Sequence, residues 1–346
     1  MRINKLGRTN ILVSRICLGT MTFGEQNNSK DAYRQLDLAI DHGVNFIDTA
    51  EAYSFPGRPE TQGSSEKIIG SWLRDRGNRN KIVIATKITG PSKERSHIRG
   101  GKLKYTRKQV AEAVDLSLKR LKTDYIDLYQ THWPERKSNY FGKLGYLHAE
   151  DDDITPLEEQ LGALNEQVKI GKIRAIGVSN ETAWGLMAFL KISEQTGLTR
   201  IAAIQNPYNL ICRQFEIGLA EASIREDVGL LAYSPLAFGA LTGKYLNGQL
   251  PENSRHKLFP QFIRYFKSGG IKATESYVAL AQKHGIEPSQ MALAFVNSQY
   301  FLTANIIGAT NEEQLKSNLK TEEMVLSDEI KKEIEAIHME NSNPSP

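Results

Sequence analysis

The chain has 346 residues, 40% of them hydrophobic and 24% charged, and its formal net charge is +4. This composition is that of a globular protein with enough apolar material for a core, and so small a charge argues against nucleic acid as a partner. No apolar run reaches the roughly 18 residues that a membrane-spanning helix requires, and residues 1–15 lack the apolar segment of a secretory signal. We therefore expect no membrane association, and nothing in the sequence indicates a homo-oligomer.

The two cysteines, Cys17 and Cys212, lie far apart in the sequence and form no CxxC motif. Such sparse cysteine usage is typical of a reducing compartment. We therefore expect a cytoplasmic protein without a structural disulfide.

Short apolar segments alternate with amphipathic helical segments, which is the pattern of βα units around a parallel sheet. The apolar segments are continuous, as expected of strands that are covered on both faces. Eight such units favour an α/β fold of the (β/α)8 TIM barrel type, and an open doubly wound sheet is the alternative. The predicted strands are Ile16–Gly19, Asn45–Asp48, Ile82–Lys87, Tyr125–Gln130, Ala175–Val178, Ala202–Gln205, Leu230–Tyr233 and Asn305–Gly308.

Start signals predict where several of the intervening helices begin. Ser29 precedes apolar residues at helical spacing, and so does Thr106. Thr155 followed by Pro156 predicts an N-cap with proline at the first helical position, and Pro288 predicts the start of a further helix. These signals support the alternation of strands and helices.

Three features extend the regular pattern within a single domain of residues 1–346. Residues 1–14 are predicted to form a hairpin ahead of the barrel, which covers residues 15–320. About 70 residues separate the seventh strand from the eighth, which is too long for one loop, so we expect two helices and a mobile segment near residues 247–270. Residues 321–346 are predicted to form a C-terminal helix and a disordered tail.

Polar residues lie at the ends of three consecutive predicted strands. Asp48 ends the second strand, Lys87 ends the third and His132 follows the fourth, while Tyr53 lies in the loop after Asp48. Each residue alone has an ordinary structural explanation, such as capping a helix. In a barrel of this type, however, the carboxyl ends of the strands carry the active site. We therefore expect the four side chains to converge.

These four residue types suit the reduction of a carbonyl group. A free phenol has a pKa of about 10 and donates its proton poorly at neutral pH, but a neighbouring ammonium lowers that pKa. We predict Tyr53 as the proton donor, Lys87 as the group that lowers its pKa, Asp48 as the anchor of Lys87, and His132 as the group that orients the carbonyl. The set requires no metal, and a cofactor must supply the hydride.

Further motifs accompany these four residues. They are Asp48-Thr49-Ala50, Gly63–Glu66, Asp124–His132, Lys172–Asn180, Gln205–Tyr208, Tyr233–Leu236, Gly239–Tyr245 and Gly308–Leu319. With the four residues, they make the chain resemble the aldo-keto reductase superfamily over nearly its whole length. The inserts Ser54–Gln62 and 132–146 make it most similar to the branch of bacterial Tas-like reductases, which is itself similar to potassium-channel β-subunits. The resemblance implies an NADPH-dependent reductase of small aldehydes or ketones.

The resemblance also implies which residues bind NADPH or NADP⁺. Ser179, Asn180 and Gln205 would hydrogen-bond the nicotinamide carboxamide, Tyr233 would stack on the nicotinamide ring, and the segment Ser234–Lys244 would wrap the pyrophosphate. The implied set is Gly19, Thr20, Met21, Asp48, Ser179, Asn180, Gln205, Tyr233, Ser234, Pro235, Leu236, Gly239, Leu241, Lys244, Arg255, Gly308, Thr310, Gln314 and Asn318. In this set Arg255 would close over the phosphates.

The last four residues of that set match the site of adenosine and the 2′-phosphate. The residues themselves support this in part, because a helix that begins after Gly308 favours an anion at its N-terminus. Thr310 to Glu313 also fit an ordinary capping box, and the two interpretations stay open. No acidic residue obviously reads a ribose 2′-hydroxyl, so we expect NADPH to be preferred over NADH.

Other interpretations of these motifs are weaker. The chain has no GxGxxG motif of a Rossmann site, and residues 239–245 are one residue short of a P-loop and have Tyr245 at the magnesium position. A regulatory module that senses bound NADP(H) is the second hypothesis. The third is a barrel aldolase in which Lys87 forms a Schiff base.

A basic cluster follows the third strand, and only Glu94 opposes its charge. A solvated loop is the favoured interpretation, and an electrostatic funnel for an anionic cofactor or substrate is the alternative. The insert after Tyr53 is expected to change the wall of the substrate pocket, and Trp133 is expected either to line that pocket or to pack under a loop. The members of the cluster are Lys93, Arg95, Arg99, Lys102, Lys104, Arg107 and Lys108.

Overall fold

Eight parallel strands close into a barrel in the computed structural model, which describes residues 1–149 and 153–346. Each strand pairs with its neighbour in the chain, and the last strand pairs with the first, so the sheet is closed. This confirms the predicted TIM barrel and excludes the open doubly wound sheet. The strands are β3 (Ile16–Gly19), β4 (Phe46–Asp48), β5 (Val83–Ile88), β6 (Ile126–Thr131), β7 (Ile173–Ser179), β8 (Ile201–Pro207), β9 (Gly229–Tyr233) and β10 (Leu302–Ile307).

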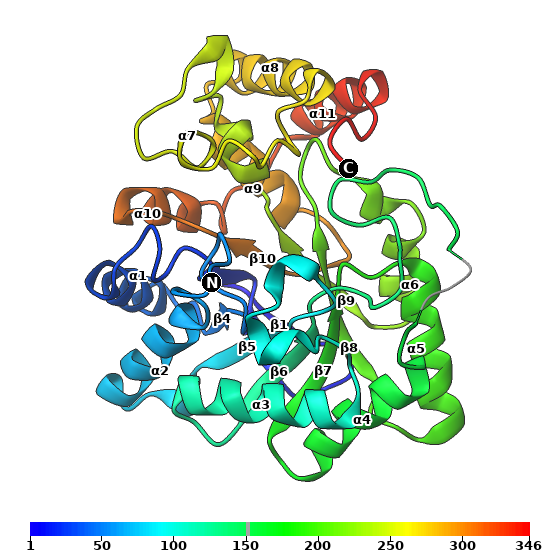
Figure 1. Cartoon of the computed structure of the whole chain (residues 1–346). Helices are drawn as coiled ribbons and strands as arrows, with labels where there is room; N and C mark the ends of the chain where they lie inside the picture. Colours follow the sequence, from blue (N-terminus) through cyan, green and yellow to red (C-terminus); the bar gives the residue numbers. More distant parts are fainter. Residues whose placement is uncertain (150–152) are drawn as a thin grey trace.

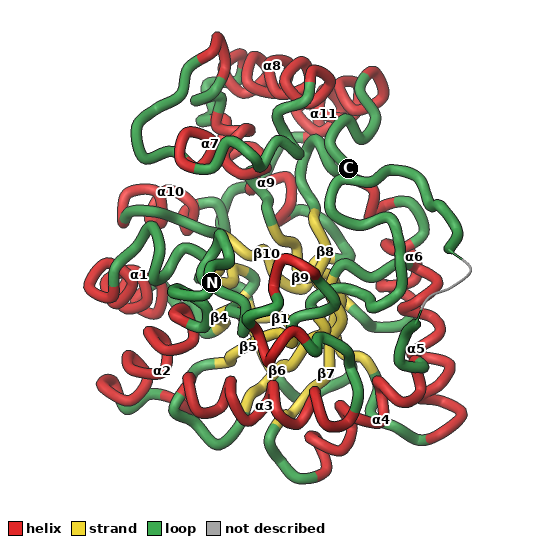
Figure 2. Tube along the Cα trace, viewed as in Figure 1, coloured by secondary structure: helices red, strands yellow, loops and turns green. Residues whose placement is uncertain are grey.

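Helices surround the strands and cover the outer face of the barrel (Figures 1 and 2). Among the described residues, no helix combines the length and the apolar character that a bilayer span needs. The helices are α1 (Ser29–Asp41), α2 (Ser64–Arg76), α3 (Arg107–Leu121), α4 (Leu157–Lys169), α5 (Ala183–Thr196), α6 (Leu219–Arg225), α7 (Arg255–Leu258), α8 (Ser268–Lys283), α9 (Pro288–Asn297), α10 (Glu312–Lys320) and α11 (Asp328–Glu340).

The strands are buried on both faces, which explains their continuous apolar runs. One face packs under the helices, where Ile47 and Ile84 share a large core with Leu36 and Trp72. The other face fills the barrel interior with a second apolar cluster. Because successive side chains of a strand point to opposite faces, a strand between two cores has no polar positions to alternate with. The interior cluster contains Cys17, Phe46, Ala85, Leu128, Ala175, Ala203, Leu231 and Ala304.

The N-terminal hairpin closes one end of the barrel. β1 (Ile3–Lys5) pairs antiparallel with β2 (Leu12–Ser14), as predicted, and Leu6 and Val13 are fully buried in the interior cluster. Gly7 lies between the two strands with φ 54°, and a Cβ there would clash with the carbonyl oxygen of Ala202. The entrance to the barrel interior is therefore at the opposite end, where the strands finish.

Two of the helix starts agree with the prediction and one differs. Thr106 caps α3 through its hydroxyl, and α9 begins at Pro288, as expected. The cap of α1 is Asn28 rather than Ser29, because the Asn28 side chain accepts the backbone N–H of Asp31. The difference is one residue and leaves the apolar face of α1 unchanged.

The starts of α4 and α10 also differ from the prediction by one residue. Pro156 has an extended ψ of 140° and occupies the cap position of α4 rather than its first turn. The preceding residue is held within the long loop between β6 and α4, where the backbone N–H of Thr155 donates to Glu135 Oε2 at 2.7 Å. At α10 the cap is Asn311, not Thr310, because the Asn311 side chain accepts a backbone N–H from the first turn.

The last residues of the chain pack against the barrel, contrary to the predicted disordered tail. Ser345 is fully buried, and its backbone N–H donates to the carbonyl of Ile211 at 3.1 Å. Asn343 Oδ1 accepts the backbone N–H of Arg213 at 2.7 Å. The polar, proline-containing composition indicated disorder, but short polar residues also satisfy buried backbone groups of a neighbouring segment.

The segment between β9 and β10 holds the two expected long helices, α8 and α9. The shorter α7 lies in the part near residues 247–270, and the mobility predicted for that part stays a prediction. At the end of the chain, α11 packs beside α8, and the two lie side by side at the top of Figure 1. Both cysteines are buried free thiols.

Candidate active site

Polar side chains replace the apolar ones where the interior-facing positions reach the carboxyl ends of the strands. Asp48 lies two residues after Phe46 on β4, and Lys87 lies two residues after Ala85 on β5. Residues two apart on a strand project to the same face, so both side chains point into the barrel above the apolar cluster. The polar residues at this level are Asp48, Lys87, Gln130, Gln205 and Tyr233.

Asp48 and Lys87 form a buried ion pair at this level. Lys87 Nζ lies 2.6 Å from Asp48 Oδ2 and donates to the carbonyl of Thr49 at 2.7 Å. The other carboxylate oxygen, Asp48 Oδ1, accepts from Gln205 Nε2 at 2.8 Å. The side chain of Lys87 is 0% exposed and that of Asp48 is 4% exposed, so water does not compete for these contacts. The predicted anchoring of Lys87 by Asp48 is therefore present in the structure.

The ion pair fixes the charge of Lys87. Burial alone lowers the pKa of this lysine, but the charge of Asp48 and its hydrogen bond to Nζ, with a contribution from Tyr53, outweigh burial and raise the pKa above its ordinary value. A lysine that forms a Schiff base must be neutral when it attacks. The surroundings of Lys87 therefore disfavour the aldolase hypothesis.

Tyr53 lies beside this ion pair. Lys87 Nζ is 4.9 Å from the centroid of the Tyr53 ring. Burial raises the pKa of Tyr53, and the nearby charge of Lys87 opposes this without cancelling it, so the pKa lies above its ordinary value. This corrects the lowered pKa that we expected, because desolvation of the phenolate outweighs the lysine charge. The phenol therefore keeps its proton at neutral pH, as a proton donor must.

The insert after Tyr53 folds back on itself beside the barrel. The backbone N–H of Ser54 donates to the carbonyl of Thr61 at 3.2 Å, and Gln62 Nε2 donates to the carbonyl of Glu51 at 2.5 Å. Phe55, within the insert, lines the cavity described below. The insert thus forms part of the wall near Tyr53, as expected.

His132 faces Tyr53 across the site. Their ring centroids are 5.7 Å apart with an interplanar angle of 77°. Asn180 Nδ2 donates a hydrogen bond to the backbone carbonyl of His132 at 2.8 Å. Burial lowers the pKa of His132 well below 6.5, and the charges of Lys87 and Arg95 add to this effect. The imidazole is therefore neutral at pH 7 and can donate a hydrogen bond to a carbonyl oxygen.

A cavity of about 1500 Å³ opens above these residues. Asp48, Tyr53 and His132 line it, and Lys87 lies buried behind them. Trp133 also lines the cavity, and its Nε1 donates to the carbonyl of Pro91 at 3.0 Å, so both expectations for this residue hold. The structure thus brings all four predicted catalytic residues together at one end of the cavity.

The residues implied to bind NADPH surround the same cavity, with one difference. Leu241 is 1% exposed and packs in the core outside the cavity. The reason is the 3-10 segment Ala237–Thr242, in which Phe238 and Gly239 have positive φ values and turn toward the cavity. The residues of the set that line it are Gly19, Thr20, Met21, Asp48, Ser179, Asn180, Gln205, Tyr233, Ser234, Pro235, Leu236, Gly239, Lys244, Arg255, Gly308, Thr310, Gln314 and Asn318.

Near the catalytic residues, the polar members of this set hold one another in place. Ser179 Oγ donates to the carbonyl of Gln205 at 2.7 Å, and the Tyr233 hydroxyl donates to Asn180 Oδ1 at 2.6 Å. Gln205 was expected only to contact a cofactor, but it also anchors Asp48. Gln205 lies two residues after the apolar Ala203 and so faces the barrel interior, and this spacing was the sequence signal for its second role.

At the other end of the cavity, the loop between β10 and α10 leaves room for a ligand. A Cβ built on Gly308 would meet nothing within 4 Å. Gln314 Oε1 accepts both the backbone N–H and the hydroxyl of Thr310, at 3.0 and 3.1 Å, and Asn318 Nδ2 donates to the carbonyl of Gly308 at 3.2 Å. These contacts fix the loop beside the positive end of the α10 dipole, which favours an anion.

Arg255 adds an unpaired positive charge to the cavity wall. Its Nε and Nη2 atoms are buried and have no hydrogen-bond partner among the described residues. The guanidinium carbon lies 3.9 Å from the ring centroid of Phe238 and 4.9 Å from that of Phe55. Burial lowers the pKa of Arg255 to about 10, so the group is still charged at pH 7. Unsatisfied N–H groups on a buried cation favour an anionic ligand.

Sequence reasoning missed a buried ion pair behind the site. Glu51 Oε1 accepts from the backbone N–H of Thr89 at 2.5 Å and from Arg99 Nη2 at 3.0 Å. The side chains of Glu51 and Arg99 are each 1% exposed. A glutamate between Asp48 and Tyr53 was the available signal, since a buried carboxylate needs a partner. The pair joins the loop that carries Tyr53 to the loop after β5.

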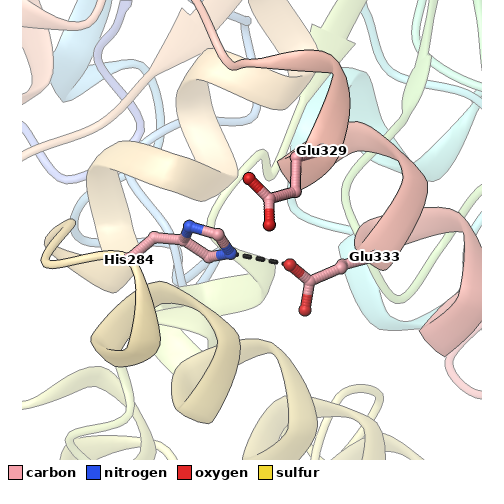
Figure 3. A group of neighbouring side chains, drawn as sticks. All are labelled: His284, Glu329 and Glu333. Atoms are coloured by element: carbon pink, nitrogen blue, oxygen red, sulfur yellow. Dashed lines mark hydrogen bonds and ion pairs between the residues drawn. The ribbon is translucent and has the colours of Figure 1, made fainter.

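One further group of titratable residues, none of which lines the cavity, joins the end of α8 to α11 (Figure 3). Ligand atoms of His284, Glu329 and Glu333 lie within 4.8 Å of one another. His284 Nε2 is 2.7 Å from Glu333 Oε1, and Lys283 Nζ is 2.6 Å from Glu333 Oε2. Both oxygens of Glu333 are thus engaged, and we interpret the group as an ion-pair contact between the end of α8 and α11.

A closed parallel barrel with these four side chains at its carboxyl end defines a class of oxidoreductases. The chain belongs to the Aldo/keto reductase family, whose pattern matches residues 15–338. It is 49% identical to Protein tas of Escherichia coli K12 over 346 residues, which is 100% of both chains. It is 38% identical to an aldo-keto reductase of Babesia bovis over 77% of this chain and 98% of that protein. A probable voltage-gated potassium channel subunit beta of Arabidopsis thaliana is 30% identical over 94% of this chain and 92% of its own length.

Proposed function

We propose that this protein reduces small aldehydes or ketones to alcohols, with Tyr53 as the proton donor and NADPH as the hydride source. The observation that carries the proposal is a protonated phenol placed beside the buried Asp48–Lys87 ion pair and opposite the neutral His132. The raised pKa of Tyr53 and the lowered pKa of His132 give these two groups the protonation states that their proposed roles need. Membership of the family supports the same class of reaction.

The chain's own residues would act on the carbonyl oxygen. His132 donates a hydrogen bond that orients this oxygen, and the Tyr53 hydroxyl transfers its proton to it as negative charge develops there. Lys87 stabilises the phenolate that this transfer leaves, and Asp48 keeps Lys87 charged and in position. The proton and one hydride together convert the carbonyl into an alcohol.

NADPH supplies that hydride when bound, and the residues of the cavity wall fit it. The unpaired N–H groups of Arg255 suit a pyrophosphate. The open space at Gly308 beside the N-terminus of α10 suits the 2′-phosphate end. Ser179, Asn180 and Gln205 would hold the carboxamide, and Tyr233 would support the ring. We propose NADPH rather than NADH because the far end of the cavity favours an additional anion.

The substitution Tyr53→Phe tests the proposal. General acid catalysis is worth roughly a hundred-fold to ten-thousand-fold in rate, so kcat for an aromatic aldehyde should fall by about three orders of magnitude. The dissociation constant of NADPH, measured by fluorescence, should change little and should stay below that of NADH. Full turnover in this variant would refute the role of Tyr53, and equal affinity for the two cofactors would refute the preference for NADPH.

We also propose that the protein works in the cytoplasm. Cys17 and Cys212 are buried free thiols, and reduced thiols of this kind are the rule in that compartment. Cell fractionation with antibody detection tests the location.

A further inference from the structure

The basic cluster after β5 does not act as a unit in the structure. Arg99 is buried against Glu51, Lys104 Nζ lies 2.6 Å from Asp153 and Arg107 Nη1 lies 2.6 Å from Glu166. Of the seven basic residues in the cluster, all within the described part of the chain, Lys93 and Arg95 line the cavity. The cluster therefore divides into three residues in ion pairs, the exposed Lys102 and Lys108 outside the cavity, and two cations that line it.

Arg95 is the more enclosed of these two cations. It is half-buried, whereas Lys93 is exposed. Its guanidinium packs against Gly57 of the insert, where any Cβ would collide with Nη1. Its guanidinium carbon also lies 5.7 Å from the ring centroid of Trp133. Contacts on two sides hold the group in a defined place on the wall.

No described carboxylate forms an ion pair or a hydrogen bond with Arg95. The neighbouring Glu94 lines the same cavity, but it is exposed and acts on Arg95 only through the electrostatic effect of its charge. A half-buried guanidinium keeps part of its five N–H donors in water, and a carboxylate that binds in the cavity can replace that water with charge-assisted hydrogen bonds. The arrangement favours an acceptor supplied by a ligand.

The position of Arg95 separates it from the cations proposed to bind the cofactor. A series of rings connects it to the catalytic residues, since Trp133 is 4.9 Å from His132 and His132 is 5.7 Å from Tyr53, centroid to centroid. Arg255 stacks on Phe238 of the segment proposed to wrap the pyrophosphate, and it also lies 4.9 Å from the ring of Phe55 in the insert. Arg95 instead shares its part of the wall with Trp133, next to His132, and we assign it to the substrate side.

We propose that Arg95 forms an anion-binding subsite for the substrate, so that the preferred carbonyl compounds carry a carboxylate a few atoms from the carbonyl carbon. The inference rests on the proposed reductase function and names its substrate class. One guanidinium with Glu94 beside it suits a monoanion, and its planar fork matches the two oxygens of a carboxylate. The insert sets this specificity, because Gly57 leaves the space that the guanidinium occupies.

The test compares 3- and 4-carboxybenzaldehyde with 3- and 4-formylbenzamide, which have the same shape without the charge. The ratio of kcat/KM for acid over amide, taken for the better isomer, should favour the acid in the wild type and fall roughly tenfold or more in Arg95→Met, the typical effect of a charge-assisted hydrogen bond. Arg95→Lys keeps the charge but loses the planar fork, so its acid-over-amide ratio should lie between those of the wild type and Arg95→Met. Gly57→Ala should lower the ratio as well, because it displaces the guanidinium.

Lys102→Met is the matched control, because Lys102 belongs to the same cluster but is exposed outside the cavity. It removes the same charge and should leave the ratio as in the wild type. Raising the ionic strength should weaken the preference for the acid only where Arg95 is present. A wild-type enzyme without this preference, or one whose preference survives Arg95→Met, would overturn the inference while leaving the reductase function intact.

A binding measurement separates failure of the subsite from failure of the proposed function. If the wild type reduces none of the four compounds, the reductase proposal fails, and calorimetry with 4-(hydroxymethyl)benzoate then decides on the subsite. Binding that Arg95→Met weakens roughly tenfold would keep the anion site, and absent or unchanged binding would overturn it as well.

Discussion

Two regions around the cavity hold cations in different ways. At the ends of β4 and β5, Lys87 lies behind the wall and is paired with Asp48, and both oxygens of that carboxylate are engaged. On the cavity wall itself, Arg255 has buried N–H groups without partners among the described residues, and Arg95 forms no ion pair within the same ranges. The paired cation can shift the pKa of the neighbouring Tyr53 phenol because its own charge is fixed. The unpaired cations are left to be neutralised by what binds, and burying them without a ligand is unfavourable.

The strongest test of this difference is the removal of the paired cation. Lys87→Met leaves Asp48 buried with only Gln205 as a partner, and breaking a buried ion pair typically costs about 3 to 5 kcal/mol. We expect the free energy of unfolding in urea to fall by this amount and turnover to be lost. Adding Asp48→Asn should recover part of the stability but none of the activity. Unchanged stability in Lys87→Met would remove the distinction between the two regions.

Removal of an unpaired cation should weaken ligand binding and leave the free energy of unfolding nearly unchanged. Arg255→Met deletes a charge that forms no ion pair with a described residue and contacts only the rings of Phe238 and Phe55 and Met21 Sδ, so stability without cofactor should change little. The dissociation constant of NADPH should rise by roughly tenfold or more, because charge-assisted hydrogen bonds to phosphate are lost. The exposed Lys257, two residues further along, provides the control Lys257→Met, which should leave NADPH affinity intact. A large loss of stability in Arg255→Met would show that this arginine is structural.

The smallest expected effect concerns His132 and pH. Its pKa in the folded protein lies well below the value of about 6.5 in the unfolded chain, so unfolding takes up a proton below pH 6.5. Its contribution to stability is complete above that pH and is lost progressively as the pH falls. Between pH 6.5 and 5.5 this loss should be about 1 kcal/mol.

Urea unfolding at the two pH values measures this contribution. His132→Gln should lose about 1 kcal/mol less of its free energy of unfolding than the wild type loses over this interval. Equal losses in wild type and His132→Gln would mean that the imidazole is not held neutral by burial.

Much of the barrel could be predicted because its signals are local. Continuous apolar runs such as that of β5 follow from burial on both faces, and Thr106 and Pro288 mark helix starts through their own backbone preferences. The exceptions share one cause. Thr155, next to the extended Pro156, is tied to Glu135 at the far end of the same long loop, and the tail packs on the barrel because Ile211 and Arg213 supply its partners. Contacts between distant segments decided these cases, and no local pattern contains them.

The candidate site divides in the same way. The residue types Asp48, Tyr53, Lys87 and His132 and their places at strand ends were legible in the sequence, because closing a parallel barrel brings consecutive strand ends together. The sequence could not settle the direction of the Tyr53 pKa shift, since that depends on how far burial exceeds the effect of the lysine charge. Nor could it say which members of the basic cluster find acidic partners. Distances of a few ångströms between remote segments set both outcomes, and only the folded chain defines them.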